Sequence, residues 1–303
     1  MPLRRLPPLL FGRRSRYARE PLGLLAGLAI VVLWSAWYIV SRAGLLGSLT
    51  PADITFIRYA TGSALVLPLL WRWRGVWRRG VPWRTLAVLV PSYGFLYALA
   101  LFFGLRDTPA ANAGVLLNGL LPAAAALGAW LAFGQGVGRG KLAAIAVLLA
   151  ANLLMFHAGL ADGKLSWALL WIVAATGLLA AYMTVTRRQP VDIRILLPAM
   201  SLGNLLLFLP LWPFMASGLG QASAGAIALQ AVFQGLVNQL LVVWLISFTI
   251  SRIGSVSTSV LYGAVPALTA VLGWLFLGER LAGIEVAAIA GCCAGIAAFG
   301  RSR

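Results

Sequence analysis

Residue types that carry out catalysis or bind metals are scarce in this sequence. The 303 residues include seven acids, one histidine and two cysteines, and Cys292 and Cys293 are adjacent inside an apolar run. Enzyme and metal sites need clusters of acids, histidines or thiols, and the sequence contains no such cluster. It also lacks a Gly-x-x-x-x-Gly-Lys-Ser/Thr loop for nucleotide phosphates. We therefore expect no enzyme activity, no catalytic residue, no metal, no cofactor and no self-contained ATP-driven pumping.

Arg58 is the one basic residue that falls inside an apolar stretch. A cation in hydrocarbon is costly unless it has a partner, so it marks either a structural pair or a binding site. Arg58 could pair with Asp53, five positions earlier, or extend to the membrane surface and hold its helix in place. It could instead bind the carboxylate or phosphate of a solute. Sequence alone leaves these alternatives open.

Two amide side chains form a second polar group inside an apolar stretch. Gln234 and Asn238 are four residues apart and therefore share one face of a helix. They could hydrogen-bond to a neighbouring helix, or they could line a water-filled cavity. We treat both as candidate substrate-binding residues.

Two prolines mark a further candidate site. Asn118 stands one turn before Pro122, and Tyr262 stands one turn before Pro266. Each proline removes a helix hydrogen bond and frees a carbonyl close to the preceding polar residue. We predict that both prolines kink their helices and serve gating, and that Asn118 and Tyr262 line a cavity.

Aromatic residues extend this candidate cavity. Trp34 lies too deep in its apolar segment to belong to an interfacial belt, whereas Trp37 and Tyr38 are expected nearer the outer boundary. Tyr93 and Tyr97 share one helix face near mid-depth. A nearly neutral, aromatic cavity would suit an aromatic or amphipathic solute, although each aromatic could equally be packing between helices.

The elements that position these residues are membrane spans. The chain is 61% hydrophobic, only 10% charged, and has a mean hydropathy of +0.91, which a soluble domain does not show. A membrane helix needs about 20 mostly apolar residues. Ten stretches qualify: 22–41, 53–71, 84–104, 110–133, 140–158, 165–186, 192–213, 227–250, 255–277 and 282–300.

The excess of basic residues predicts the orientation of these spans. The net charge is +17, which in a polar protein would suggest nucleic acid, but here the charges alternate with apolar spans. With the N-terminus inside, 19 of the 24 basic residues fall in inner segments and four in outer loops. We therefore expect a bacterial inner-membrane protein with both termini in the cytoplasm. Its inner face should attract anionic lipid, and we expect no nucleic-acid partner.

The two halves of the sequence repeat. Shifting the chain by 144 aligns Leu117–Ala146 with Leu261–Ala290, and 12 of the 30 pairs are identical. Both copies contain Gly-x-x-Pro followed by Trp-Leu-x-x-Gly. The repeat unit holds five spans, so the second copy crosses the membrane in the opposite sense, as is frequent in secondary transporters. We predict an all-α polytopic membrane protein with ten transmembrane helices in two inverted five-helix repeats, at 21–158 and 159–300, after a basic cytoplasmic segment at 1–20.

This pattern resembles the EamA-type drug/metabolite transporter superfamily. The likeness covers residues 21–300 and rests on the two repeated motifs, the run from Trp274 to Arg280, Leu33-Trp34-Ser35, and Arg58. The first copy departs at its turn, where Gly134-Gln135-Gly136 replaces the usual Gly-Glu-Arg. The resemblance implies ten helices, inner termini, and a cavity formed mainly by helices one, three, four, six, eight and nine. It does not name a substrate.

The function predicted is secondary transport of small organic solutes, such as amino acids or amphipathic metabolites and drugs, with export as the favoured direction. Alternating access between the inverted repeats would move the solute past a site near the midplane. An integral-membrane enzyme or a non-transporting membrane subunit is the alternative. Gly23-x-x-x-Gly27 and Gly291-x-x-x-Gly295 permit close helix approach, so either face could form a homodimer seam.

Overall fold

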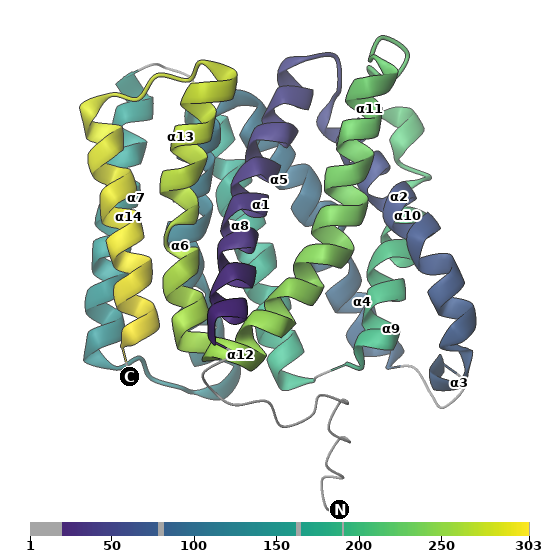
Figure 1. Cartoon of the computed structure of the whole chain (residues 1–303), viewed down its shortest axis with the longest axis horizontal. Helices are drawn as coiled ribbons and strands as arrows, with labels where there is room; N and C mark the ends of the chain where they lie inside the picture. Colours follow the sequence, from purple (N-terminus) through teal and green to yellow (C-terminus); the bar gives the residue numbers. More distant parts are fainter. Residues whose placement is uncertain (1–19, 78–81, 162–164, 190, 303) are drawn as a thin grey trace, which may run out of the picture.

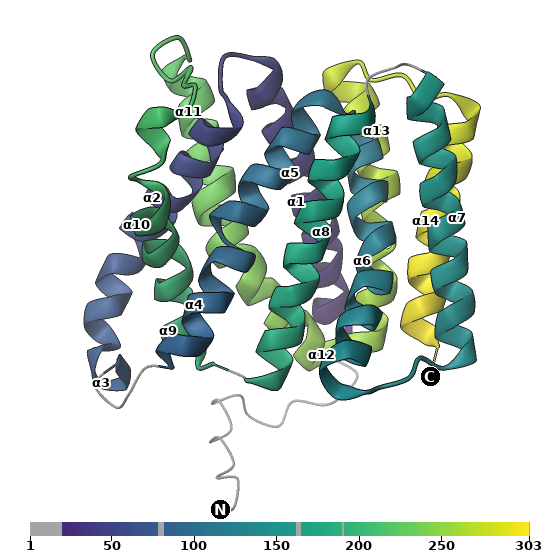
Figure 2. The same cartoon turned by 180° about the vertical axis from the view of Figure 1, so that it is seen from behind.

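The computed structural model describes residues 20–77, 82–161, 165–189 and 191–302, and within them it forms a bundle of helices without strands (Figures 1 and 2). The predicted basic segment before Glu20 lies outside the described residues. The elements are α1 (Glu20–Leu46), α2 (Pro51–Arg72), α3 (Arg74–Trp77), α4 (Trp83–Ser92), α5 (Phe95–Asp107), α6 (Ala110–Phe133), α7 (Arg139–Ala161) and α8 (Leu165–Arg188). They continue with α9 (Ile193–Pro198), η2 (Ala199–Gly203), α10 (Asn204–Phe208), η3 (Trp212–Phe214), α11 (Ala224–Gln230), η4 (Ala231–Leu241), α12 (Val242–Tyr262), α13 (Val265–Leu277) and α14 (Gly283–Arg301).

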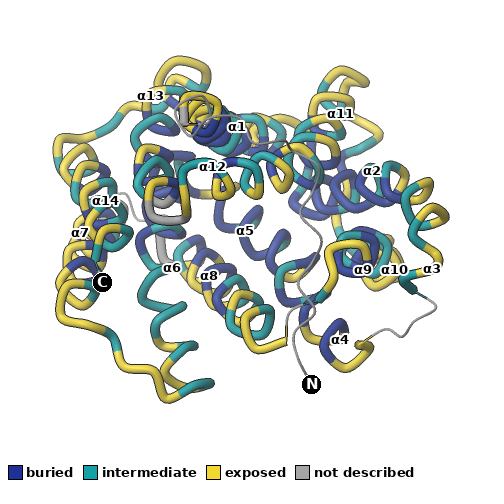
Figure 3. The backbone as a smooth tube through the Cα atoms, turned by 60° about the horizontal axis from the view of Figure 1, so that its bottom comes forward, coloured by how far each residue is buried: buried dark blue, intermediate teal, exposed yellow. Residues whose placement is uncertain are grey.

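The predicted all-α polytopic fold is confirmed. Among the described residues, nine helical segments are long and apolar enough to cross a membrane, and the shorter apolar segment Ile193–Phe208 stands where the seventh span was expected. Large apolar side chains cover the outside of the bundle, as a lipid-facing surface requires. In Figure 3 the exposed backbone lies mainly at the periphery, and the buried stretches of α2 and α5 lie further inside.

The helices run up and down between two ends of the bundle. Both α1 and α4 start at the end where α14 finishes, which we call the terminal end, and α8 starts at the opposite, far end (Figure 1). The first helix of each half therefore runs in the opposite sense to its counterpart. The halves also pack closely on each other, because α1 contacts α12 and α13, α7 contacts α14, and α2 contacts η4.

The repeated motifs form helix ends. Gly134 and Gly278, which close the two Trp-Leu-x-x-Gly motifs, follow α6 and α13 in the left-handed conformation with φ of 64° and 66°. Glycine adopts this conformation without the strain of a Cβ atom, so it is the usual residue after a helix.

At the start of α9, Asp192 accepts a hydrogen bond from the backbone of Arg194, and the Arg194 guanidinium holds the pKa of that carboxyl below its ordinary value.

Several spans are interrupted near mid-depth. The third is broken between α4 and α5 at Tyr93 and Gly94, and η2 and η4 place π-helical turns in the seventh and eighth. The ninth is broken between α12 and α13, so Pro266 lies in the first turn of a new helix, where proline fits well. The prediction that Pro266 kinks one continuous helix was therefore wrong. Pro122, in contrast, does lie inside a helix, α6.

The two Gly-x-x-x-Gly faces are covered within the chain. A Cβ atom on Gly23 would meet Arg252 and Ile253, and one on Gly27 would meet Leu261, so this face packs on α12. Gly291 and Gly295 face α7 through Ala151 and Leu148. Both surfaces on which a homodimer was expected are therefore occupied by contacts within the chain.

Candidate functional site

A cavity of about 400 Å³ lies between the two halves of the bundle. Its wall comes from α1, α2, α5, α6, α8, α12, α13, α14 and η4, together with the break at Tyr93. The lining residues are Trp34, Trp37, Tyr38, Arg58, Tyr93, Tyr97, Leu117, Asn118, Leu121, Pro122, Leu179, Met183, Asn238, Tyr262, Val265, Ile296 and Phe299. Arg58 is the only charged residue among them.

Aromatic rings form much of this wall. Trp34 and Tyr262 meet edge to face with ring centroids 4.8 Å apart, and Tyr93 lies at the same distance from Tyr97. The first of these contacts joins the two halves, since Trp34 comes from α1 and Tyr262 ends α12. The wall is thus made of flat apolar faces, with hydroxyl and amide groups at its edges.

Trp37 and Tyr38 also line the cavity, which corrects their assignment to the outer boundary. They are 5% and 4% exposed, and Trp37 donates from Nε1 to Gln234 Oε1 at 2.7 Å. Counting positions along the apolar segment placed them near the lipid interface. The segment, however, continues as helix to Leu46, so both rings lie deeper than that count suggested.

Arg58 and Asp53 do not pair. Asp53 accepts from Ser217 Oγ at 2.6 Å, from the Gly218 amide at 2.7 Å and from the Thr50 amide at 3.0 Å, which ties the start of α2 to the loop before α11. Five positions on a helix separate the two side chains by about 140° around the axis, which places them on different faces. Asp53 is therefore a structural residue, and Arg58 is left for the cavity.

Gln234 and Asn238 have different positions, although both belong to η4. Gln234 is fully buried behind the cavity wall, where it accepts from Arg58 Nη1 at 3.2 Å and donates to Ser41 Oγ at 2.8 Å. Asn238 lines the cavity itself. With its oxygen turned toward them, Asn238 accepts from Trp37 Nε1 at 2.9 Å and Arg58 Nη1 at 3.3 Å.

Asn118 and Tyr262, the paired residues before the two prolines, both line the cavity. Pro122 has no amide proton, so the carbonyl of Asn118 lacks its helical partner there. Tyr262 ends α12, and its hydroxyl is buried without a hydrogen-bond partner among the described residues. Pro122 lines the cavity with them, whereas Pro266 is not among the lining residues.

The cavity is closed at the far end and exposed toward the terminal end. Arg58, Trp37 and Tyr38 are almost fully buried, whereas Met183, close to the terminal end of α8, is 46% exposed. Phe299 reaches the cavity from the last turns of α14. Exposure therefore rises along the lining toward the end where the termini lie.

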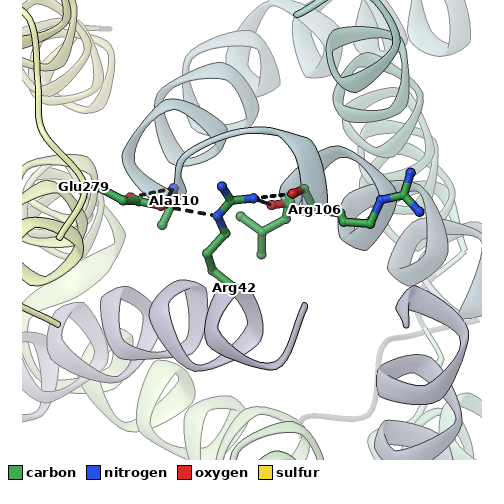
Figure 4. Close-up of polar contacts among 5 residues, drawn as sticks. Arg42, Arg106, Ala110 and Glu279 are labelled. Atoms are coloured by element: carbon green, nitrogen blue, oxygen red, sulfur yellow. Dashed lines mark hydrogen bonds and ion pairs between the residues drawn. The ribbon is translucent and has the colours of Figure 1, made fainter. Parts of the chain in front are cut away.

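A polar cluster at the far end joins the halves, and we call it the latch (Figure 4). Arg42, near the end of α1, forms an ion pair with Glu279, Nε to Oε1 at 3.3 Å, and donates to the carbonyls of Leu105 and Arg106. Glu279, just after α13, accepts from the Ala110 amide at 2.9 Å. Through this bond Glu279 caps the start of α6.

The match to known proteins decides the family. The model of the EamA-like transporter family matches residues 21–157 and again residues 166–301, which together make up most of the chain. The protein belongs to the EamA-like transporter family. The described part of this EamA-like protein thus holds nine candidate spans and one shorter apolar segment, divided between two matched copies.

One solved structure shares the fold of this EamA-like protein. It is described only as "Crystal structure of protein" and is 21% identical in sequence to this chain. The match covers 92% of this chain and 96% of the solved chain, with a TM-score of 0.59. At that identity the likeness concerns the fold alone. The comparison with curated proteins gave no match.

The residues that sequence reasoning missed belong to the polar support of the site. Gln230 donates to the Val40 carbonyl at 2.6 Å and accepts from Gln234, and Ser41 receives a bond from Gln234. Small or amide side chains near a helix end gave no signal of their own. Arg42 and Glu279 are 237 positions apart in the sequence. The sequence shows two charges outside the spans but does not indicate that they pair.

Proposed function

We propose that this EamA-like protein is a secondary transporter of small organic solutes, such as amino acids or amphipathic metabolites and drugs. It works in the bacterial inner membrane with both termini in the cytoplasm. The two inverted halves rock about the cavity, which opens to one side of the membrane at a time. Its lipid-facing surface binds the bilayer, with anionic lipid at the basic face.

One observation carries this proposal. The cavity lies between the halves, is exposed toward the terminal end, and is closed at the far end by a latch that draws on both halves. A volume of about 400 Å³ lies in the range of small-molecule sites. Inverted repeats offer two related arrangements, of which this one opens at the terminal end.

The orientation supports export. The sequence assigns 19 of the 24 basic residues to inner segments, so by the positive-inside rule the end where α1 starts and α14 finishes is the cytoplasmic one. The open cavity then receives solute from the cytoplasm, and closing it there while the latch opens would release solute outside.

Flux in liposomes tests the proposal. Purified protein should move at least one solute from a panel of amino acids, aromatic acids and amphipathic drugs. Asn118→Ala, Asn238→Ala and Tyr262→Ala should each lower that flux by about tenfold, since a lost hydrogen bond or ring contact costs roughly 1–1.5 kcal/mol. Leu131→Ala, at a 70% exposed position of α6, is the control and should leave flux unchanged.

Two results would contradict the proposal. Absence of flux for the whole panel, with protein whose helical content and melting curve are intact, would argue against transport. Normal flux in all three cavity variants would keep transport but remove this cavity as its site.

A further inference from the structure

The charge of Arg58 has no carboxylate partner among the described residues. Arg58 is 6% exposed, and its Nη1 donates to the neutral oxygen of Gln234. Its guanidinium carbon lies 6.0 Å from the ring centroid of Trp37 and 5.9 Å from that of Tyr59. The Nε atom is buried without a hydrogen-bond partner among the described residues. All these neighbours are neutral, so the site keeps a full positive charge.

Five carboxylates of the described residues are engaged elsewhere. They bond as follows: Asp53 to Thr50, Ser217 and Gly218; Asp107 to Arg106; Asp192 to Arg194; Glu279 to Arg42 and Ala110; Glu285 to Asn112 and Ala282. Removing a charge from water without a counter-charge is strongly unfavourable. Arg58 would therefore gain more from an incoming anion than a paired arginine would.

The position of Arg58 lets a ligand reach it. It lines the main cavity and also a smaller adjoining pocket of about 110 Å³, and it is the only charged residue in either lining. An arginine guanidinium binds a carboxylate through charge-assisted hydrogen bonds. Aromatic faces of Trp34, Tyr93 and Tyr97 border the same cavity.

We propose that Arg58 binds the anionic group of the solute, and that the preferred solutes are organic monoanions with a flat apolar body. The proposal rests on the proposed function and narrows its substrate class. A carboxylate supplies the missing counter-charge to the guanidinium, while the aromatic wall holds the body. The lining contains no carboxylate for an ammonium group, so an amino acid is bound less well than the acid that lacks its amine.

Thermal stabilisation of the detergent-solubilised full-length protein tests this. The probes are 3-phenylpropionate, its neutral amide, phenylalanine and inorganic phosphate. We expect 3-phenylpropionate to raise the melting temperature in a saturable way, and the amide and phenylalanine to bind much more weakly. Arg58→Met should bind 3-phenylpropionate roughly 10- to 100-fold more weakly, as expected for loss of a charge-assisted hydrogen bond. Arg74→Met, the same change at an exposed position of α3, should bind it as the wild type does.

The unliganded variant separates binding from a structural role. Gln234 Oε1 keeps its bond from Trp37 when Arg58 is removed. Arg58→Met without ligand should therefore melt at or above the temperature of the wild type, whereas a structural arginine would give a clear drop. If that variant fails to fold, the proposal is overturned, because the charge was then holding the bundle together.

The wild-type comparison needs no variant. Equal binding of the amide or of phenylalanine would overturn the proposal, and so would stabilisation by inorganic phosphate but not by 3-phenylpropionate. Flux separates the two proposals: binding of 3-phenylpropionate without transport of any solute would contradict the transporter function alone. Transport of neutral solutes without any binding of the carboxylate would contradict the anion site alone.

Discussion

Asn204 and Asn152 have different hydrogen-bonding roles in this bundle. Both are buried, and each donates to the carbonyl four positions earlier in its own helix, Met200 or Leu148. Asn204 also accepts from the Phe95 amide at 2.8 Å, which caps the start of α5. Asn152 Oδ1 has no partner among the described residues.

This difference predicts unequal effects of the same substitution. Asn204→Leu leaves the buried Phe95 amide without an acceptor and should lower the free energy of unfolding by about 1–3 kcal/mol. Asn152→Leu removes no bond between helices and should cost less than about 1 kcal/mol. Unfolding of both variants in detergent, followed by circular dichroism, measures the difference. Equal losses would show that the bond to Phe95 contributes little.

Of the two asparagines, only Asn204 bonds to another helix in the described structure. The sequence identifies a polar residue in an apolar span, but its partner depends on which backbone is free nearby. The Phe95 amide is free because the third span breaks there, and the apolar run from 84 to 104 contains no clear sign of that break. The same reasoning explains Arg58, whose neutral partners come from a span almost 180 positions away.

At the scale of elements, the break between α4 and α5 has a precise packing requirement. A Cβ atom on Gly94 would overlap Asn204 Oδ1 and the Val90 carbonyl oxygen. Only glycine lets the chain end α4 and begin α5 at this place with Asn204 against it. The interruption brings Tyr93 and Tyr97 to the cavity.

Alanine at position 94 should therefore disrupt the break. Gly94→Ala should lower stability by at least 2 kcal/mol, in the range of overpacked or strained sites. Gly177→Ala, inside α8 with nothing within 4 Å of the new Cβ, should instead stabilise by about 0.5–1 kcal/mol. Thermal unfolding of the two variants checks the opposite signs. A loss in both would mean that helical glycines are needed for another reason.

The sequence predicted the ends of several elements more reliably than their interruptions. Gly134 and Gly278 end helices as their repeated motif suggests, and Thr50 with Asp53 caps α2. These signals are local, since each cap bonds within a few residues. The break before Pro266 and the π-helical turns of η4 depend on packing against other helices, which a single span does not encode.

At the scale of the whole molecule, the latch holds the far end shut. Its side chains are only 11–12% exposed, and Arg42 and Glu279 meet two carbonyls and one amide as well as each other. Since Leu105 and Ala110 flank the turn between α5 and α6, opening the far end requires that these bonds be exchanged for water. Under the proposed alternating access, we therefore expect the latch to set the balance between the closed and the open far end.

Cysteine labelling tests this balance. In a background of Cys292→Ala and Cys293→Ala, Val265→Cys places one thiol in the cavity lining. A membrane-impermeant thiol reagent added on the far side should react slowly with this protein. Adding Arg42→Gln or Glu279→Gln should speed labelling roughly 5- to 150-fold, as expected for a bias of about 1–3 kcal/mol. Unchanged labelling would show that the latch does not gate the far end.

Two further variants sharpen the test. Arg106→Gln is the control, since the Arg106 side chain pairs with Asp107 at the surface and only its carbonyl joins the latch. Exchanging the charges, with Arg42→Glu and Glu279→Arg together, should not restore slow labelling. A carboxylate at position 42 cannot donate to the carbonyls, and a guanidinium at position 279 cannot accept from the Ala110 amide. Restored slow labelling would show that the latch depends only on the attraction between the two charges.

Hydropathy and the internal repeat were enough to predict the fold class and the transporter family. Each of these is a property of short segments or of their order, because a span must be apolar along its own length whatever surrounds it. The tertiary structure decided the partners: Arg58 with Gln234 in place of Asp53, Glu279 with Ala110 and Arg42, and Trp37 with the cavity in place of the boundary. Those choices depend on side chains far apart in sequence, and only the packed bundle brings them within hydrogen-bonding distance.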